Sequence, residues 1–194
     1  MKIIDIMKHS AELLGLTQER EILNTATEEN EAEILQNEEI CRMLNLSALS
    51  IQELCSNYIS IYIEEEVETE DKKYPLNKLK NYIRMLNIKQ DNDLVKFKIV
   101  NRNIIFEQDG KYTIKFASYP DITSMFDTVE VLNNLSPDVL VMGLCSYYAI
   151  SRGMFKEFET FHDKYIEKAN ALKDLKMFEL PFRRWEWKIN KHCK

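Results

Sequence analysis

The sequence predicts an α+β fold: a helical bundle with a small antiparallel β-sheet inserted between its helices and an extended arm at the C-terminus. Three observations support this prediction. Apolar residues recur at helical spacing before residue 63 and again after residue 137. Over residues 79–118 the apolar period changes to two, as in strands. After residue 177 the chain is aromatic and basic and lies outside any periodic element.

Residues 1–63 are predicted to form the N-terminal helices. A first helix ends at Gly15, a typical stop signal, and the polar residues 17–33 predict a loop or a short exposed helix. A long helix is then predicted from about Glu31 to Tyr62. Its apolar stripe favours packing inside the core of the same chain over a coiled-coil dimer. The stripe consists of Ile40, Leu44, Ser47, Ile51, Leu54 and Tyr58.

Residues 64–78 are predicted to form an acidic linker, because EEEVETEDKK at 64–73 is mainly a block of like charge. A metal site on its three consecutive glutamates is not expected, since consecutive residues point to different faces of a helix.

Residues 79–120 are predicted to form the inserted antiparallel sheet, with three or four strands. Two alternating runs flank the dipeptide Asp109-Gly110, which is a strong hairpin signal. Residues 82–88 can supply another strand. The alternation predicts lysines on the solvent-exposed face of the sheet. These lysines are Lys96, Lys98, Lys111 and Lys115.

Residues 121–177 are predicted to form a connector followed by a C-terminal helical hairpin. Ser136-Pro137-Asp138 combines a cap, a proline at the first helical position and an acid in the first turn. The helix over 137–152 is apolar nearly all round, which predicts a central position. Gly153 separates it from a second helix that reaches about residue 176. With the arm at 178–194, these segments are expected to make one structural domain overall.

Composition and charge restrict the class of protein. The chain has 194 residues, of which 45% are hydrophobic. This is enough to form a hydrophobic core without disulfide bonds or structural metal ions. Its net charge is -6, but residues 1–71 carry four basic side chains against seventeen acidic ones. The acidic and basic parts can pair within one chain, which we favour, or meet head to tail between copies. Neither a secretion signal nor a membrane span is expected.

The residues for catalysis, metal binding and cofactor binding are sparse. None of the four glycines lies in a phosphate-binding motif, only three histidines occur, and no CxxC pair is present. Cys41, Cys55 and Cys145 fall at apolar positions and predict small buried side chains, reduced in a cytoplasmic setting. His162 lies on an apolar stripe, where a core or edge histidine with a hydrogen-bond partner is expected. We therefore predict no enzyme, no metal and no cofactor.

The arm at residues 178–194 is the segment most informative about partners. Tryptophan and arginine are enriched at interface hot spots, so we favour a contact of the arm with a neighbouring subunit over the alternative that the arm folds back onto its own helices. Its candidate contact residues are Pro181, Phe182, Arg183, Arg184, Trp185 and Trp187. Basic residues among aromatic ones can also hold phosphates and stack on bases. The arm and the lysines of the sheet therefore leave open a nucleic-acid-binding regulator.

A series of motifs follows the predicted sheet, in the order Ser118-Tyr119-Pro120, Ser124–Asp127, Val141–Tyr148, Gly153, Phe161, Lys164-Tyr165 and Pro181–Trp185. In this order they resemble the connector and adaptor proteins that tailed bacteriophages and prophages of low-GC Gram-positive bacteria encode. The chain is also distantly similar to the tail tubular protein A type. Cys145-Ser146 stands where such relatives usually have two alanines.

The resemblance implies a structural subunit of the virion. It implies a ring, commonly of twelve copies, at the head–tail interface, where the subunit joins the portal protein to tail-side proteins around the DNA channel. DNA would be a neighbour without specific recognition, no membrane would be involved, and the host cytoplasm would hold the protein before assembly. A tail-completion or tail-tube-end protein is the nearest alternative.

Overall fold

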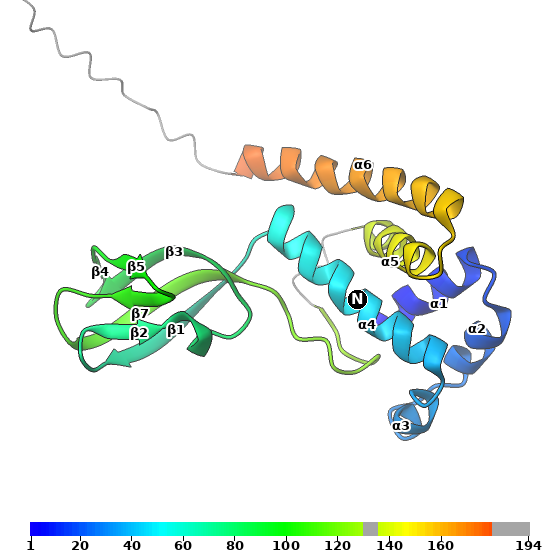
Figure 1. The fold of residues 1–194 in the computed structure, drawn as a ribbon, viewed down its shortest axis with the longest axis horizontal. Helices are drawn as coiled ribbons and strands as arrows, with labels where there is room; N and C mark the ends of the chain where they lie inside the picture. The colour runs from blue at the N-terminus through cyan, green and yellow to red at the C-terminus, as the bar shows by residue number, and fades with distance from the viewer. Residues whose placement is uncertain (130–135, 180–194) are drawn as a thin grey trace, which may run out of the picture.

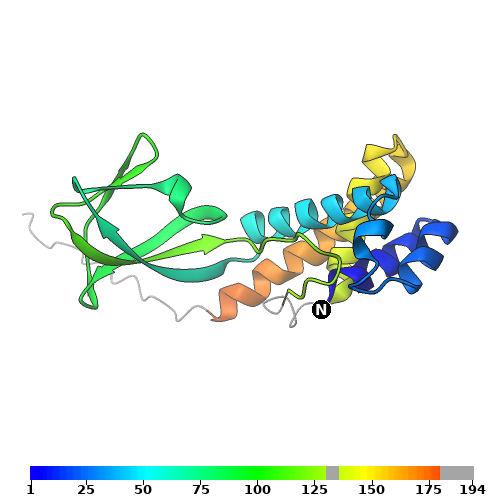
Figure 2. The same cartoon turned by 90° about the horizontal axis from the view of Figure 1, so that it is seen from below.

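The computed structural model describes residues 1–129 and 136–179, with side chains as far as Leu172. The chain forms an elongated molecule with a helical unit at one end and a β unit at the other (Figures 1 and 2). Each unit has its own hydrophobic core. Because helices from before and after the β unit meet in one core, the β unit is an insertion, and the predicted α+β fold is confirmed.

The helical unit places one apolar helix at its centre. Four helices precede the β unit: α1 (Ile3–Leu13), α2 (Thr17–Asn24), α3 (Glu31–Ile34) and α4 (Glu38–Asn57). Two follow it, α5 (Pro137–Ser151) and α6 (Phe155–Glu179). α5 packs against α1, α4 and α6 (Figure 1). Contact on three sides explains why α5 is apolar nearly all round, as its sequence predicted.

The predicted long helix from Glu31 to Tyr62 is wrong at both ends. α4 begins at Glu38 because the side chain of Asn37 caps it, accepting hydrogen bonds from the N–H groups of Glu39 (2.9 Å) and Ile40 (3.2 Å). α4 ends at Asn57, and a strand starts four residues later. The apolar stripe nevertheless packs in the core of its own chain, as predicted; its fully buried members are Ile40, Leu44, Ser47, Ile51 and Leu54.

The β unit consists of two antiparallel sheets with a core between them. The larger sheet has the order β1 (Ile61–Thr69), β7 (Gly110–Ser118), β3 (Tyr82–Gln90), β4 (Asp93–Leu94). The smaller has the order β2 (Lys73–Pro75), β6 (Asn103–Ile105), β5 (Lys98–Val100). A short 3₁₀ helix, η1 (Leu76–Lys78), follows β2. The buried core residues are Val67, Leu79, Ile88, Ile104, Phe106, Tyr112, Ile114 and Phe116.

Three two-residue turns connect strands of the β unit. Two of them close hairpins within a sheet, whereas the turn at Asp71-Lys72 leads from β1 to β2 of the other sheet through the single bridge Glu70 to Lys73. Both residues of each turn have positive φ, the geometry of a type I′ turn, which matches the right-handed twist of the flanking strands. The turns are Asp71-Lys72, Asp91-Asn92 and Asn101-Arg102. Aspartate and asparagine tolerate the left-handed region better than most residues. These dipeptides therefore make tight turns without glycine.

The acidic linker predicted at residues 64–78 is wrong. Residues 64–69 belong to β1, which pairs with β7 over its whole length, from Ile61 opposite Ser118 to Thr69 opposite Gly110. The like charges are tolerated because the partner strand supplies lysines: Lys115 Nζ lies 2.7 Å from Glu64 Oε1. The acidic and basic parts of the chain therefore meet within one molecule at this pair of strands.

The hairpin predicted across Asp109-Gly110 is also wrong. β6 and β7 flank this dipeptide but lie in different sheets, so the chain crosses from one sheet to the other between them. The crossing is fixed by stacking of Phe106 on Tyr112, whose ring centroids lie 4.1 Å apart. The Tyr112 hydroxyl also donates a 2.7 Å hydrogen bond to the Gln108 carbonyl. The strand predicted near residues 82–88 is confirmed as β3.

Candidate partner-binding surfaces

The residues predicted to contact a neighbouring subunit lie outside the described residues. They are Pro181, Phe182, Arg183, Arg184, Trp185 and Trp187. The helix that leads to them, α6, ends at Glu179. α6 runs back along the helical unit and ends on the side that faces the β unit (Figures 1 and 2). The position at which the arm leaves the folded molecule is therefore defined.

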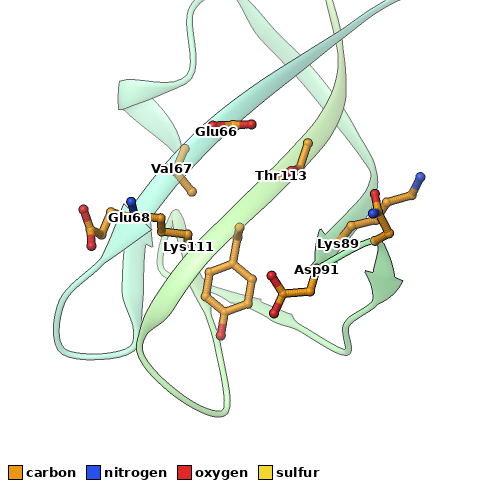
Figure 3. Close-up of a pocket in the computed structure, with 9 residues that line it drawn as sticks. Glu66, Val67, Glu68, Lys89, Asp91, Lys111 and Thr113 are labelled. Carbon is orange, nitrogen blue, oxygen red and sulfur yellow. The ribbon is translucent and has the colours of Figure 1, made fainter.

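A broad polar hollow of about 420 Å³ lies on the outer face of the larger sheet (Figure 3). Its charged side chains come from three strands and alternate in sign. In the strand register Glu68 lies opposite Lys111, and Glu66 lies opposite Thr113, which in turn lies opposite Lys89. Asp91 adds a further carboxylate at the rim. The hollow therefore carries charges of both signs, three carboxylates and two lysines.

The four lysines predicted to share one exposed face do not form a single basic surface. Lys111 and Lys115 lie on β7 of the larger sheet, opposite glutamates of β1, whereas Lys98 lies on β5 of the smaller sheet. The hydrogen bond and charge of Lys115 hold the pKa of Glu64 below its ordinary value. The lysines of β7 are therefore matched by acids of the same chain, which does not favour phosphate binding there.

Glu53 of α4 joins three helices in the helical unit. Its Oε2 accepts hydrogen bonds from the hydroxyls of Tyr147 on α5 (2.9 Å) and Tyr165 on α6 (3.0 Å). Burial, with the nearby Glu53 carboxylate, raises the pKa of Tyr147 to about 12 and raises that of Tyr165 as well. Both phenols are therefore protonated donors at neutral pH, and the cluster acts as a clamp between helices.

Glu39, near the start of α4, makes a second clamp. It accepts a 2.6 Å hydrogen bond from the Tyr148 hydroxyl and pairs with Arg152 at the end of α5. Burial acts to raise the pKa of Glu39, but the hydrogen bonds from Tyr148 and Arg152 and the nearby positive charges outweigh it and lower that pKa. The carboxylate is therefore ionised and partnered at neutral pH.

Both clamps were missed by sequence reasoning. The only local signal is the pair Tyr147-Tyr148 on an otherwise apolar helix, since buried tyrosine hydroxyls need partners. The acceptors, Glu39 and Glu53, are about a hundred residues away along the chain and stand beside the apolar stripe of α4.

An open groove of about 650 Å³ runs between α1 and α6 over the surface of α5. Apolar side chains of Leu13, Val141 and Met142 line it, with charged residues on both sides. Lys168 and Asp138 form a 3.3 Å ion pair at one end. An apolar floor between charged walls is the surface that an amphipathic helix of a partner would fit.

The two edges of the larger sheet have different chemistry. β1, at one edge, carries glutamates, whereas β4, at the other edge, carries Leu94, which is 71% exposed. β5, which follows β4 in the chain but belongs to the smaller sheet, also has exposed apolar side chains, Ile99 and Val100.

The remaining predicted residues fit structural roles. His162 Nδ1 lies 3.3 Å from Ser146 Oγ, and its ring stacks on Phe158, as expected for a core histidine with a polar partner. Cys55 and Cys145 are buried, and burial raises the pKa of the Cys145 thiol to about 11. Cys41 is partly buried.

Within residues 1–129 and 136–179, no three histidine, cysteine or acidic side chains are arranged to hold a metal ion. None of the helices in that part of the chain is long and apolar enough to cross a membrane. No protein-family model and no curated protein matches the chain.

Proposed function

We propose that the chain is a ring-forming structural adaptor subunit of a phage head–tail connector, which joins the portal protein to the tail around the DNA channel. The observation that carries this proposal is the difference between the two edges of the larger sheet, since β1 presents a row of glutamates and the two-residue strand β4 presents Asp93 and the exposed Leu94. A ring is built by a head-to-tail contact between unlike surfaces, repeated by rotation. The two edges of the larger sheet are different surfaces on opposite sides of one subunit, as such a contact requires.

The shape of the molecule supports the same proposal. An adaptor contacts one partner above the ring and a different partner below it. The helical unit, with its groove over α5, and the β unit lie at opposite ends of an elongated molecule (Figure 1). Because each unit has its own hydrophobic core, each can keep its fold when it binds a different partner. The Glu39 and Glu53 clamps hold α4, α5 and α6 in fixed positions relative to one another. The motifs that resemble phage adaptors, from Ser118 onward, add to this support.

Removal of residues 180–194 is expected to impair assembly and leave the monomer folded. No described core residue lies beyond Leu172, so the unfolding midpoint should change by less than a degree or two. Mass photometry of the full chain, alone and with its portal protein, should show ring-sized particles. The shortened chain should need at least tenfold more protein to form them.

Two results would count against these proposals. If the shortened chain assembles at the same concentration as the full chain, the arm has no role in assembly. A full chain that stays monomeric at all concentrations, even with the portal protein, would remove the ring itself. Circular dichroism of the shortened chain serves as the control for folding.

A further inference from the structure

We propose that residues 183–191 of a neighbouring copy bind along the open edge of β1 as an added strand of the larger sheet. The inference deepens the proposed function, because it rests on self-assembly of the chain. It does not depend on the place of the ring in a virion.

The open edge of β1 is the first observation. β1 is the outermost strand of its sheet and pairs with β7 on one side over nine residues. On its other side, within the described chain, the only strand bridge is Glu70 to Lys73, at the turn into β2. A long edge strand presents a row of backbone N–H and C=O groups that can pair with another strand.

The charge of β1 selects the kind of strand that can bind. Glu64, Glu66 and Glu68 are all exposed on the outer face of the sheet. Lys115 pairs with Glu64 and Lys111 lies opposite Glu68, but Glu66 lies opposite an uncharged residue, Thr113, so β1 keeps an excess of negative charge at its centre. Two copies of β1 would bring like charges together across the new pair, which is unfavourable. A basic strand is therefore favoured over a symmetric β1–β1 contact.

The C-terminal segment has the required chemistry. Between residues 183 and 191 it carries four basic residues and one acidic residue. Sequence analysis treats this segment as aperiodic, but apolar and polar residues alternate over a short stretch, Trp185-Glu186-Trp187-Lys188-Ile189. This stretch is too short to predict a strand by itself. Its alternation is the pattern that a strand needs in order to pair with an open sheet edge.

The alternation matches the two faces of β1. In an added strand, Arg184 and Lys188 would share the face of Glu66 and Glu68, with Glu186 between them, because strand side chains alternate with a period of two. Trp185 and Trp187 would then lie on the opposite face. Ile63 is on that face of β1 and is 38% exposed, so it offers them an apolar contact.

The length of the chain constrains the geometry. α6 ends at Glu179, so residues 180–182 form the link to the added strand. Three extended residues span about 10 Å. The β1 edge of the neighbouring copy must therefore lie close to the end of α6. Since α6 ends on the side of its own β unit (Figures 1 and 2), the β units of adjacent copies are expected to lie side by side.

A charge exchange in the full-length chain tests the contact. Glu66→Lys with Glu68→Lys should raise the midpoint concentration for assembly about tenfold, and so should Arg184→Glu with Lys188→Glu. All four substitutions together should bring it back to within about threefold of the wild type. Glu157→Lys with Glu159→Lys, the same change at exposed positions of α6, is the matched control and should change it less than twofold. Simple addition of the two defects would overturn the inference.

Hydrogen–deuterium exchange of the full-length wild type locates the contact. Protection of residues 61–68 that rises with protein concentration, in step with assembly, would support the added strand. Protection that is independent of concentration would mean that each chain binds its own segment, and would overturn the inference. Assembly without any change at β1 would also overturn it but leave the ring proposal standing, whereas absence of assembly would overturn both.

Discussion

Replacement of Gly143 by alanine is expected to lower the free energy of unfolding by up to about 2 kcal/mol. Gly143 lies in α5, and a Cβ atom there would overlap Ser50 Oγ of α4 and lie 3.1 Å from Tyr165 Cε2 of α6. Alanine should stabilise a helix by about 1 kcal/mol relative to glycine. Forced overpacking of a core costs about 1–3 kcal/mol. The overlap should exceed this gain, because it involves two helices at once.

Urea unfolding of the full chain measures this effect, and Ser50→Ala provides the matched control. Ser50 Oγ is buried and has no hydrogen-bond partner among the described residues, so its loss alone should be neutral or slightly stabilising. In the Gly143→Ala background, Ser50→Ala removes the nearest overlapping atom and should recover more than half of the lost stability. A Gly143→Ala variant as stable as the wild type would contradict the close crossing of α4 and α5.

Replacement of Glu53 by alanine is expected to cost about 2–3 kcal/mol of unfolding free energy. The substitution removes the shared acceptor of the Tyr147 and Tyr165 hydroxyls. A buried donor left without a partner costs about 1–3 kcal/mol, and Tyr165 is only 1% exposed. Glu53→Gln keeps one acceptor oxygen and should cost about 1 kcal/mol.

A double-mutant cycle with Tyr165→Phe separates the clamp from other effects of the Glu53 substitution. Because both phenols have raised pKa values and stay protonated, the coupling should be about 1 kcal/mol and nearly constant between about pH 6 and pH 9. Equal losses for Glu53→Ala and Glu53→Gln, or no coupling to Tyr165, would show that the carboxylate does not clamp the helices.

The late helices were predictable because their signals are local. Ser136 and Pro137 mark the start of α5, and Gly153 marks the break before α6. The central place of α5 also followed from its own composition. The same reasoning identified the stripe of α4 but extended the helix too far. Only the side-chain cap at Asn37 and the strand that begins at Ile61 set its limits.

The edge strand β1 was not predictable because its stability depends on residues far away in the chain. Its run of glutamates resembles a solvated linker until β7, about fifty residues later, places Lys115 and Lys111 opposite them. The period-two pattern is present only at its end, where Val67 and Thr69 are buried.

The turns were misread for a related reason. Asp109-Gly110 has the strongest turn composition but lies at a crossing between sheets, whereas Asp91-Asn92 and Asn101-Arg102 form the tight hairpins without glycine. A turn signal reports local backbone freedom and does not identify which strands will pair. The carboxylates of the two clamps were missed for the same reason, since their partners are fixed only by the packing of α4 on α5.

If the proposed function holds, the chain is part of a phage particle, and cryo-electron microscopy of that particle tests the proposal most directly. The account predicts a closed ring of subunits between portal and tail, around the DNA channel, with the helical unit and the β unit recognisable in each subunit. Particles that lack the chain, or that carry it away from the head–tail junction, would contradict the account.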